Sequence, residues 1–113
     1  MNQQDIEKIW RWSGVSQHKM KLPSGMAFTG DGWQYPELTL DNLFKYAIAN
    51  LPEPVIFLRE CSGEGWTKKG WMCCVSYYEP VGNNFTEVIG LSEGCDNPAE
   101  SLAQAILEVI END

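Results

Sequence analysis

The most informative hydrophobic pattern lies at residues 70–78, which read Gly-Trp-Met-Cys-Cys-Val-Ser-Tyr-Tyr. Side chains alternate between the two faces of a β-strand, so a strand with one solvent-exposed face shows a polar residue at every second position. In this segment both sets of alternating positions are apolar or amphipathic. The pattern therefore predicts a central strand that is covered on both faces, with helices as the expected covers.

Two more strands are predicted beside this central one. Residues 55–60 have the length of a strand and begin with four consecutive apolar residues, and residues 85–91 follow a turn that contains Pro80 and Gly82. The short connections favour hairpins, and hence an antiparallel meander of three strands. Residues 16–36 show no clear period, so they hold either a fourth, edge strand or a long binding loop.

Helical periodicity appears in two segments that precede the strands. Residues 5–13 place apolar side chains three and four positions apart, and Gly14 is suited to end this helix in a left-handed conformation. Either Thr39 or Asp41 can cap a second helix, which is expected to run to about Asn50.

The last helix has the clearest start signal in the chain. Asn97 fits the N-cap, Pro98 the first helical position and Glu100 the third, where its side chain can reach back to a free amide. We therefore expect this helix to begin at Pro98 and to face the sheet with its apolar side. The residues on that side are Ala99, Leu102, Ala103, Ile106, Val109 and Ile110.

These elements predict a single α+β domain that spans residues 1–113. Its antiparallel sheet of three strands, or of four with the edge segment, is expected to carry helices on both faces as an α-β-α sandwich. A chain of 113 residues is too short for two ordinary domains. No apolar run approaches the roughly 20 residues that span a bilayer, and the N-terminus lacks a secretory pattern, so a cytoplasmic location without membrane contact is expected.

The net charge of -8 comes from the C-terminal part of the chain. Residues 1–70 hold eight acidic and eight basic side chains, whereas residues 71–113 hold eight acidic side chains and no Lys or Arg. Such a surface repels nucleic-acid phosphates and attracts basic partners, so direct nucleic-acid binding is not expected. The alternative interpretation is that acidity only keeps a small protein soluble.

The cysteines and the histidine do not form the pattern of a catalytic or metal site. Without a secretory signal, the four cysteines at positions 61, 73, 74 and 95 are expected to be reduced thiols. The chain has no Cys-x-x-Cys, and its only histidine, His18, lies far from all four cysteines in sequence. We therefore predict a non-enzymatic protein without catalytic residues, metal ions or cofactors.

Exposed loop aromatics are candidate binding residues. Trp33, Tyr35 and Trp66 lie in expected loops, and Trp and Tyr are enriched in the hot spots of protein interfaces. A stacking platform for single-stranded nucleic acid would need basic residues alongside, and only Lys68 and Lys69 are close to Trp66 in sequence. These aromatics are therefore better interpreted as anchors for a protein partner.

Three segments carry a resemblance to a known family. They are Trp33-x-x-Pro36 leading into Thr39-x-Asp41-Asn42-Leu43, the aromatic strand of residues 71–78, and the closing run from Asn97 to Ile106. With the order of helices and strands, they resemble the phage ABA sandwich domain family, small phage and prophage proteins whose name describes helices on both faces of a sheet. The resemblance implies a phage or prophage origin and supplies no catalytic residues. The cysteine that is often present in the family's closing helix is absent here.

The predicted function is that of a small acidic accessory protein of a phage or prophage, which binds another protein with a basic surface in the host-cell cytoplasm. A sharper version is an inhibitor of a host defence nuclease of the CRISPR type, whose nucleic-acid groove an acidic surface can occupy. The alternative is a structural or assembly component that self-associates, for example as a homodimer, and a metal- or thiol-dependent enzyme ranks third. The expected partner-binding residues are Trp33, Tyr35, Trp66, Glu79, Glu87, Glu93, Asp96, Glu100 and Glu108.

Overall fold

The computed structural model describes residues 1–15, 18–19, 33–65 and 68–112. In chain order its elements are α1 (Gln3–Trp12), β1 (His18–Lys19), β2 (Trp33–Gln34), α2 (Leu40–Asn42), η1 (Leu43–Ala47), η2 (Ile48–Asn50), β3 (Val55–Cys61), β4 (Gly70–Val81), β5 (Asn84–Cys95) and α3 (Pro98–Glu111). Strands β3, β4 and β5 form an antiparallel sheet in that order, which confirms the predicted meander and the α+β class. Strands β1 and β2 pair only with each other, so they do not extend the sheet. Most of the segment expected to hold an edge strand or a binding loop, residues 16–17 and 20–32, lies outside the described residues.

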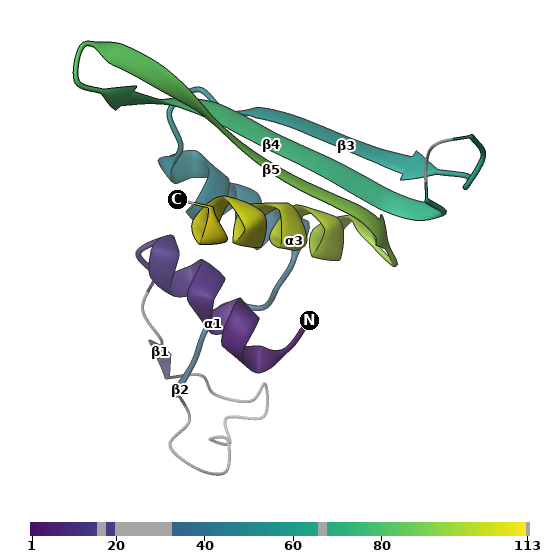
Figure 1. Cartoon of the computed structure of the whole chain (residues 1–113). Coiled ribbons are helices and arrows are strands. Elements are labelled where there is room, and N and C mark those ends of the chain that lie inside the picture. The colour runs from purple at the N-terminus through teal and green to yellow at the C-terminus, as the bar shows by residue number, and fades with distance from the viewer. Residues whose placement is uncertain (16–17, 20–32, 66–67, 113) are drawn as a thin grey trace.

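The helices lie on one side of the sheet (Figure 1). Helix α3 packs directly against β4 and β5, and α1 packs against the side of α3 that faces away from the sheet. The layers are therefore sheet, helix α3 and then helix α1. Side chains from all three layers, including Val75, Ile106 and Trp10, are fully buried in one core.

The other side of the sheet carries none of the helices that the structure describes, which corrects the expectation of helices on both faces. We call it the open face. Cross-strand pairing assigns to it Val55, Phe57 and Arg59 of β3, Met72, Cys74, Ser76, Tyr78 and Pro80 of β4, and Phe85, Glu87, Ile89 and Leu91 of β5. Apart from Met72, which is half-buried, its large apolar side chains are 44% to 72% exposed, with Ile89 and Phe85 as the two extremes. The prediction was wrong because alternating apolar residues show that a face is suited to burial, but not that the same chain covers it.

Helix α3 begins at Pro98, as predicted, and the side chain of Asn97 accepts a hydrogen bond of 2.8 Å from the backbone N–H of Glu100. The helix is buried on two sides because it lies between the sheet and α1. Its buried residues therefore include Ser101, Ala105 and Leu107, which lie outside the predicted apolar stripe. The hydroxyl oxygens of Ser101 and of Ser92 on β5 are 2.9 Å apart. The Ser92 hydroxyl also donates a hydrogen bond of 2.6 Å to the backbone carbonyl of Ser101.

The helices before the sheet follow the expected caps. Gly14 adopts a φ of +79° at the end of α1, and the backbone N–H of Val15 folds back to the Trp10 carbonyl at 2.9 Å. Residues 40–50 form one helical stretch that changes from an α-helical turn to a π-helical and then a 3-10 turn. Thr39 is its cap, since its hydroxyl accepts a hydrogen bond of 3.2 Å from the Asn42 N–H.

The hairpin of β4 and β5 is longer than the sequence pattern suggested. Both strands have 12 residues and leave only Gly82 and Asn83 in the turn. Strand β3 pairs with β4 no further than Ser76, so the hairpin continues beyond the sheet as a two-stranded arm. Proline has no backbone N–H to donate to a neighbouring strand. Pro80 is accommodated in this arm because no β3 residue pairs with it.

Candidate functional site

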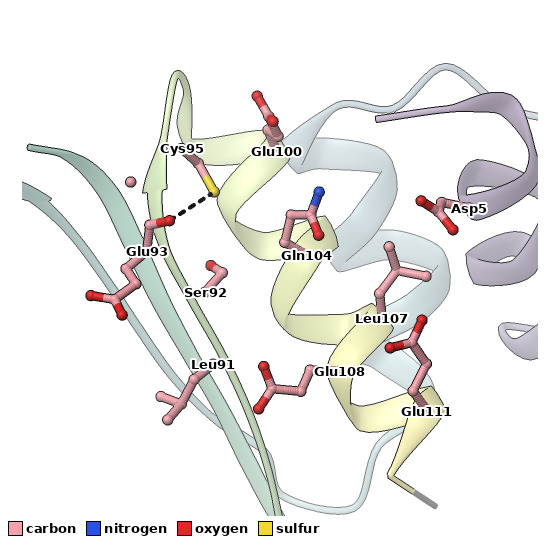
Figure 2. A pocket seen from close by; sticks show the side chains of 11 residues that line it. Asp5, Leu91, Ser92, Glu93, Cys95, Glu100, Gln104, Leu107, Glu108 and Glu111 are labelled. Carbon is pink, nitrogen blue, oxygen red and sulfur yellow. Dashed lines mark hydrogen bonds between the residues drawn. The ribbon is translucent and has the colours of Figure 1, made fainter. Parts of the chain in front are cut away.

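Five carboxylates from three elements line one cleft of about 430 Å³, which we call the acidic cleft. Asp5 comes from α1, Glu93 from β5, and Glu100, Glu108 and Glu111 from α3. Figure 2 shows the α3 side chains between the edge strand β5 on one side and Asp5 on the other. Four of the five carboxylates belong to the acidic C-terminal part of the chain, residues 71–113.

Local structure explains why these side chains share one surface. Glu100, Gln104, Glu108 and Glu111 follow one another at intervals of four, four and three residues, so they lie along one stripe of α3. Asp5 is in the first turn of α1, where its backbone N–H donates a hydrogen bond of 2.8 Å to the side chain of Asn2, the N-cap residue. A carboxylate in the first turn is also favoured by the helix dipole.

The walls between these carboxylates are partly apolar. Leu91 of β5 and Leu107 of α3 line the cleft, together with Ser92 and Cys95. Lys and Arg side chains have the matching character, because an aliphatic stem carries a charged head. The cleft is therefore suited chemically to basic side chains, whose stems can contact the leucines while their heads approach the carboxylates.

The carboxylates of the cleft are only weakly compensated within the chain. Glu111 pairs with Lys8 at 3.8 Å and Glu93 with Lys68 at 4.0 Å, and all four side chains are about half or more exposed. Exposed pairs at these distances contribute at most about 1 kcal/mol and are exchanged readily for other partners. Glu100 and Glu108 have no Lys or Arg partner within 4.0 Å among the residues that the structure describes. The cleft is thus a surface with available negative charge.

The thiols near the cleft are held in their protonated form. Cys95 donates to the carbonyl of Glu93 at 3.8 Å, and burial raises its pKa, with the charge of Glu100 acting in the same direction. Burial also raises the pKa of Cys73 to about 12. A thiolate is the nucleophilic form of cysteine, so neither environment activates its thiol for chemistry at neutral pH.

The described residues contain no group of three or more His, Cys, Asp or Glu side chains that could hold a metal ion. The cleft carboxylates are spread along a helix and over two other elements, whereas a calcium or magnesium site converges its oxygens on one point. The described helices also include none that is long and apolar enough to cross a bilayer.

Three of the predicted partner-binding residues, Glu93, Glu100 and Glu108, meet in the acidic cleft. Asp96 lies apart from them, in a hollow of about 680 Å³ that it shares with Glu60 and Lys69. Because this hollow contains a basic side chain, it does not continue the acidic surface.

The other predicted residues are distributed over the rest of the molecule. Glu79 and Glu87 lie on the hairpin arm, where Glu79 accepts a hydrogen bond of 3.3 Å from the Tyr77 hydroxyl. Tyr35 packs against the core, and its hydroxyl accepts a bond of 3.3 Å from Arg11 Nε, so it is less available than expected. Trp33 is described only by its backbone in β2, and Trp66 lies outside the described residues.

Two of the five cleft carboxylates were not among the predicted residues. Glu111 shares the helical stripe of Glu108, a spacing that is visible in the sequence. Asp5 belongs to the charge-balanced part of the chain, and only the packing of α1 on α3 brings it to the cleft. No local pattern could have identified Asp5.

Comparison with known proteins does not assign the chain to a family. No family model matches it, and neither curated proteins nor solved structures give a match.

Proposed function

We propose that this chain is a non-catalytic protein-binding protein that receives basic side chains of its partner in the acidic cleft. The observation that carries the proposal is the gathering of five carboxylates from α1, β5 and α3 around a hollow with apolar walls. A charge that served solubility alone would need no such gathering, because scattered carboxylates have the same effect.

The electrostatics favour a partner that normally binds nucleic acid. The whole chain carries a net charge of -8, and the cleft presents its carboxylates in a row along α3. A groove lined by lysines and arginines, which holds phosphates in its ordinary complex, offers the complementary potential. An inhibitor of a host defence nuclease of the CRISPR type is the specific form of this function that we propose.

A phage or prophage origin agrees with such a role and forms part of the proposal. Its support is the resemblance carried by the residues before α2, by the aromatic strand β4 and by the N-terminal half of α3. Binding in the host cytoplasm, rather than at a membrane, belongs to the same proposal.

The test is a titration of the protein against a purified CRISPR-type nuclease from which the guide RNA has been removed. We expect a submicromolar dissociation constant that weakens as salt rises, because the complex depends on exchangeable ion pairs. The cleft variant Glu100→Gln/Glu108→Gln removes two charges without changing side-chain volume, and should weaken binding at least 10-fold. Addition of a DNA duplex should compete with the wild-type protein.

The matched control is Glu79→Gln/Glu87→Gln, which removes the same number of charges from the hairpin arm. It should change the dissociation constant by less than 2-fold, because both positions are remote from the cleft. Equal weakening by the two double variants would mean that net charge alone matters. Binding that does not respond to salt would refute the electrostatic mechanism.

A further inference from the structure

The open face is a second surface, and of its residues only Leu91 also lines the acidic cleft. Its side chains on β3, β4 and β5 are largely apolar, with Val55, Phe57 and Leu91 each at least 50% exposed. Only Arg59 and Glu87 among its residues are charged. A contiguous apolar surface of this kind on a folded protein marks an interaction site.

The size of the open face matches that of a dimer interface. Three strands about 4.8 Å apart and 7 to 12 residues long, at about 3.3 Å per residue, give a projected area of about 500 Å². Two copies packed face to face would therefore bury at least about 1,000 Å² in total, which reaches the lower limit for a specific interface. The buried accessible area is larger than this projected area, because side chains make the surface uneven.

The pattern on the face is also self-complementary. In one row Phe57, Cys74 and Leu91 lie side by side, and in the next row Val55, Ser76 and Ile89 do so. A two-fold axis parallel to β4 and midway between two sheets would place each β3 opposite β5 of the second copy. Phe57 would then meet Leu91 and Val55 would meet Ile89, so apolar side chains face apolar side chains across the interface.

A second possible two-fold axis also lies midway between the two sheets but runs across the strands, at right angles to β4. The charged side chains that each axis would bring together distinguish the two arrangements. Glu93 follows Leu91 at the end of the face, and Figure 2 shows both side chains pointing away from α3. With the axis parallel to β4, Arg59 of one copy faces the region of Glu93 of the other, because both lie beyond the Cys74 row. With the axis across the strands, Glu87 would instead face Glu93 of the second copy. The first arrangement pairs opposite charges and the second pairs like charges.

We propose that the open face binds the open face of a second copy of this chain, with the two-fold axis along β4. The sheets then form the centre of the dimer, and the helices of each copy form its outer layers. The helical wall of each acidic cleft remains accessible, since Glu100, Glu108 and Glu111 lie on α3 and Asp5 on α1. The dimer contact shares only Leu91 and Glu93 with the lining of the cleft. Glu100→Gln/Glu108→Gln therefore separates the two proposals, because it should weaken partner binding and leave the dimer unchanged.

Light scattering after size-exclusion chromatography tests the dimer. At about 50 µM we expect a mass of twice the 12.8 kDa chain. Phe57→Lys should weaken dimerisation at least 10-fold, because it places a charge in the centre of the contact. Phe44→Lys is the matched control, since Phe44 is exposed to a similar extent, 43% against 50%, but lies on η1 among the helices. Circular dichroism verifies that both variants are folded.

Thiol crosslinking tests the position of the axis. Cys74 lies on the open face and is partly exposed, whereas Cys61, Cys73 and Cys95 are buried. Packed sheets lie about 10 Å apart, so a bismaleimide with a spacer of about that length should join Cys74 to its copy, and Cys74→Ser should abolish the product. The two-fold axis along β4 would also be supported if Arg59→Glu weakened the dimer and Glu93→Arg in the same chain restored it.

Three results would overturn the proposal. A monomer at concentrations up to about 100 µM would exclude the second copy as the occupant. A dimer that persists in Phe57→Lys would have a different interface, such as the exposed edge of β5. A dimer without a Cys74 crosslink would not have its axis along β4. Raised salt should strengthen this dimer, because it screens the repulsion between two acidic chains, whereas it should weaken binding at the acidic cleft.

Discussion

Gly90 on β5 lies directly against Ala105 of α3, so close that a β-carbon at position 90 would overlap the carbonyl oxygen of Ala105. The same β-carbon would be 2.6 Å from Cγ2 of Val109. Gly90 is buried and pairs with Val75 at the centre of the sheet. The distance between α3 and the sheet therefore depends on the absence of a side chain at this position.

Gly90→Ala should destabilise the protein by about 1–3 kcal/mol, because either α3 or β5 must move to accommodate one methyl group. Chemical denaturation measured by circular dichroism gives this free energy. Thr86→Ala, at an exposed position of the same strand, is the control and should cost less than about 0.5 kcal/mol. If Gly90→Ala were as stable as the control, α3 would not pack as closely as described.

Asn97 determines the stability of the start of α3. Asn97→Ala removes the acceptor of the Glu100 N–H and should cost about 1 kcal/mol, whereas Asn97→Ser keeps an acceptor and should cost much less. Thermal denaturation of both variants tests this order. Equal losses would show that the cap hydrogen bond does not contribute.

Trp10 is fully buried, and its indole N–H has no hydrogen-bond partner among the described residues. Its ring contacts Tyr46 edge-on, with the ring centroids 6.2 Å apart. Trp10→Phe removes the unpaired donor but leaves a small cavity, so the two effects oppose each other. We expect a change within about 1 kcal/mol, compared with a loss of about 3–5 kcal/mol for Trp10→Ala. Similar losses for the two variants in urea unfolding would contradict the cost assigned to the buried N–H.

The buried thiol of Cys73 should make stability fall at alkaline pH. In the unfolded chain this thiol releases its proton near pH 9, whereas burial raises its pKa to about 12 in the fold. The folded state then binds more protons between these values, so stability decreases as pH rises, by up to about 1.4 kcal/mol per pH unit. Urea unfolding from pH 8 to 11 measures the slope.

Cys73→Ala is the control for this pH dependence. It should be less stable at pH 8, because it leaves a cavity, but its stability should fall less steeply above pH 9. Parallel curves for the two proteins would assign the alkaline loss to other groups, such as the tyrosines.

The success of sequence reasoning depended on whether the decisive contacts were local. The start of α3 was predicted to the residue because Asn97, Pro98 and Glu100 make the cap among themselves. The length of the hairpin was missed because Pro80 is tolerated only where β3 has already ended, and the end of β3 is a long-range property of the fold.

The same reasoning explains the outcome for the candidate sites. Glu100 and Glu108 could be predicted because their spacing in the sequence places them on one side of a helix. Asp5 comes to lie in the same cleft only because α1 packs on α3. The apolar residues of the open face were recognised as residues suited to burial. Their exposure could not be foreseen, because a cover from the same chain and a cover from a second copy require the same alternating pattern.

The two-residue turn at Gly82 and Asn83 is the most distant point of the arm that extends beyond β3. Its position offers a practical attachment point for fluorophores, affinity handles or a surface tether. A probe inserted there would project from the tip of the arm, so that cleft binding and self-association could be followed in one preparation without a label inside either contact.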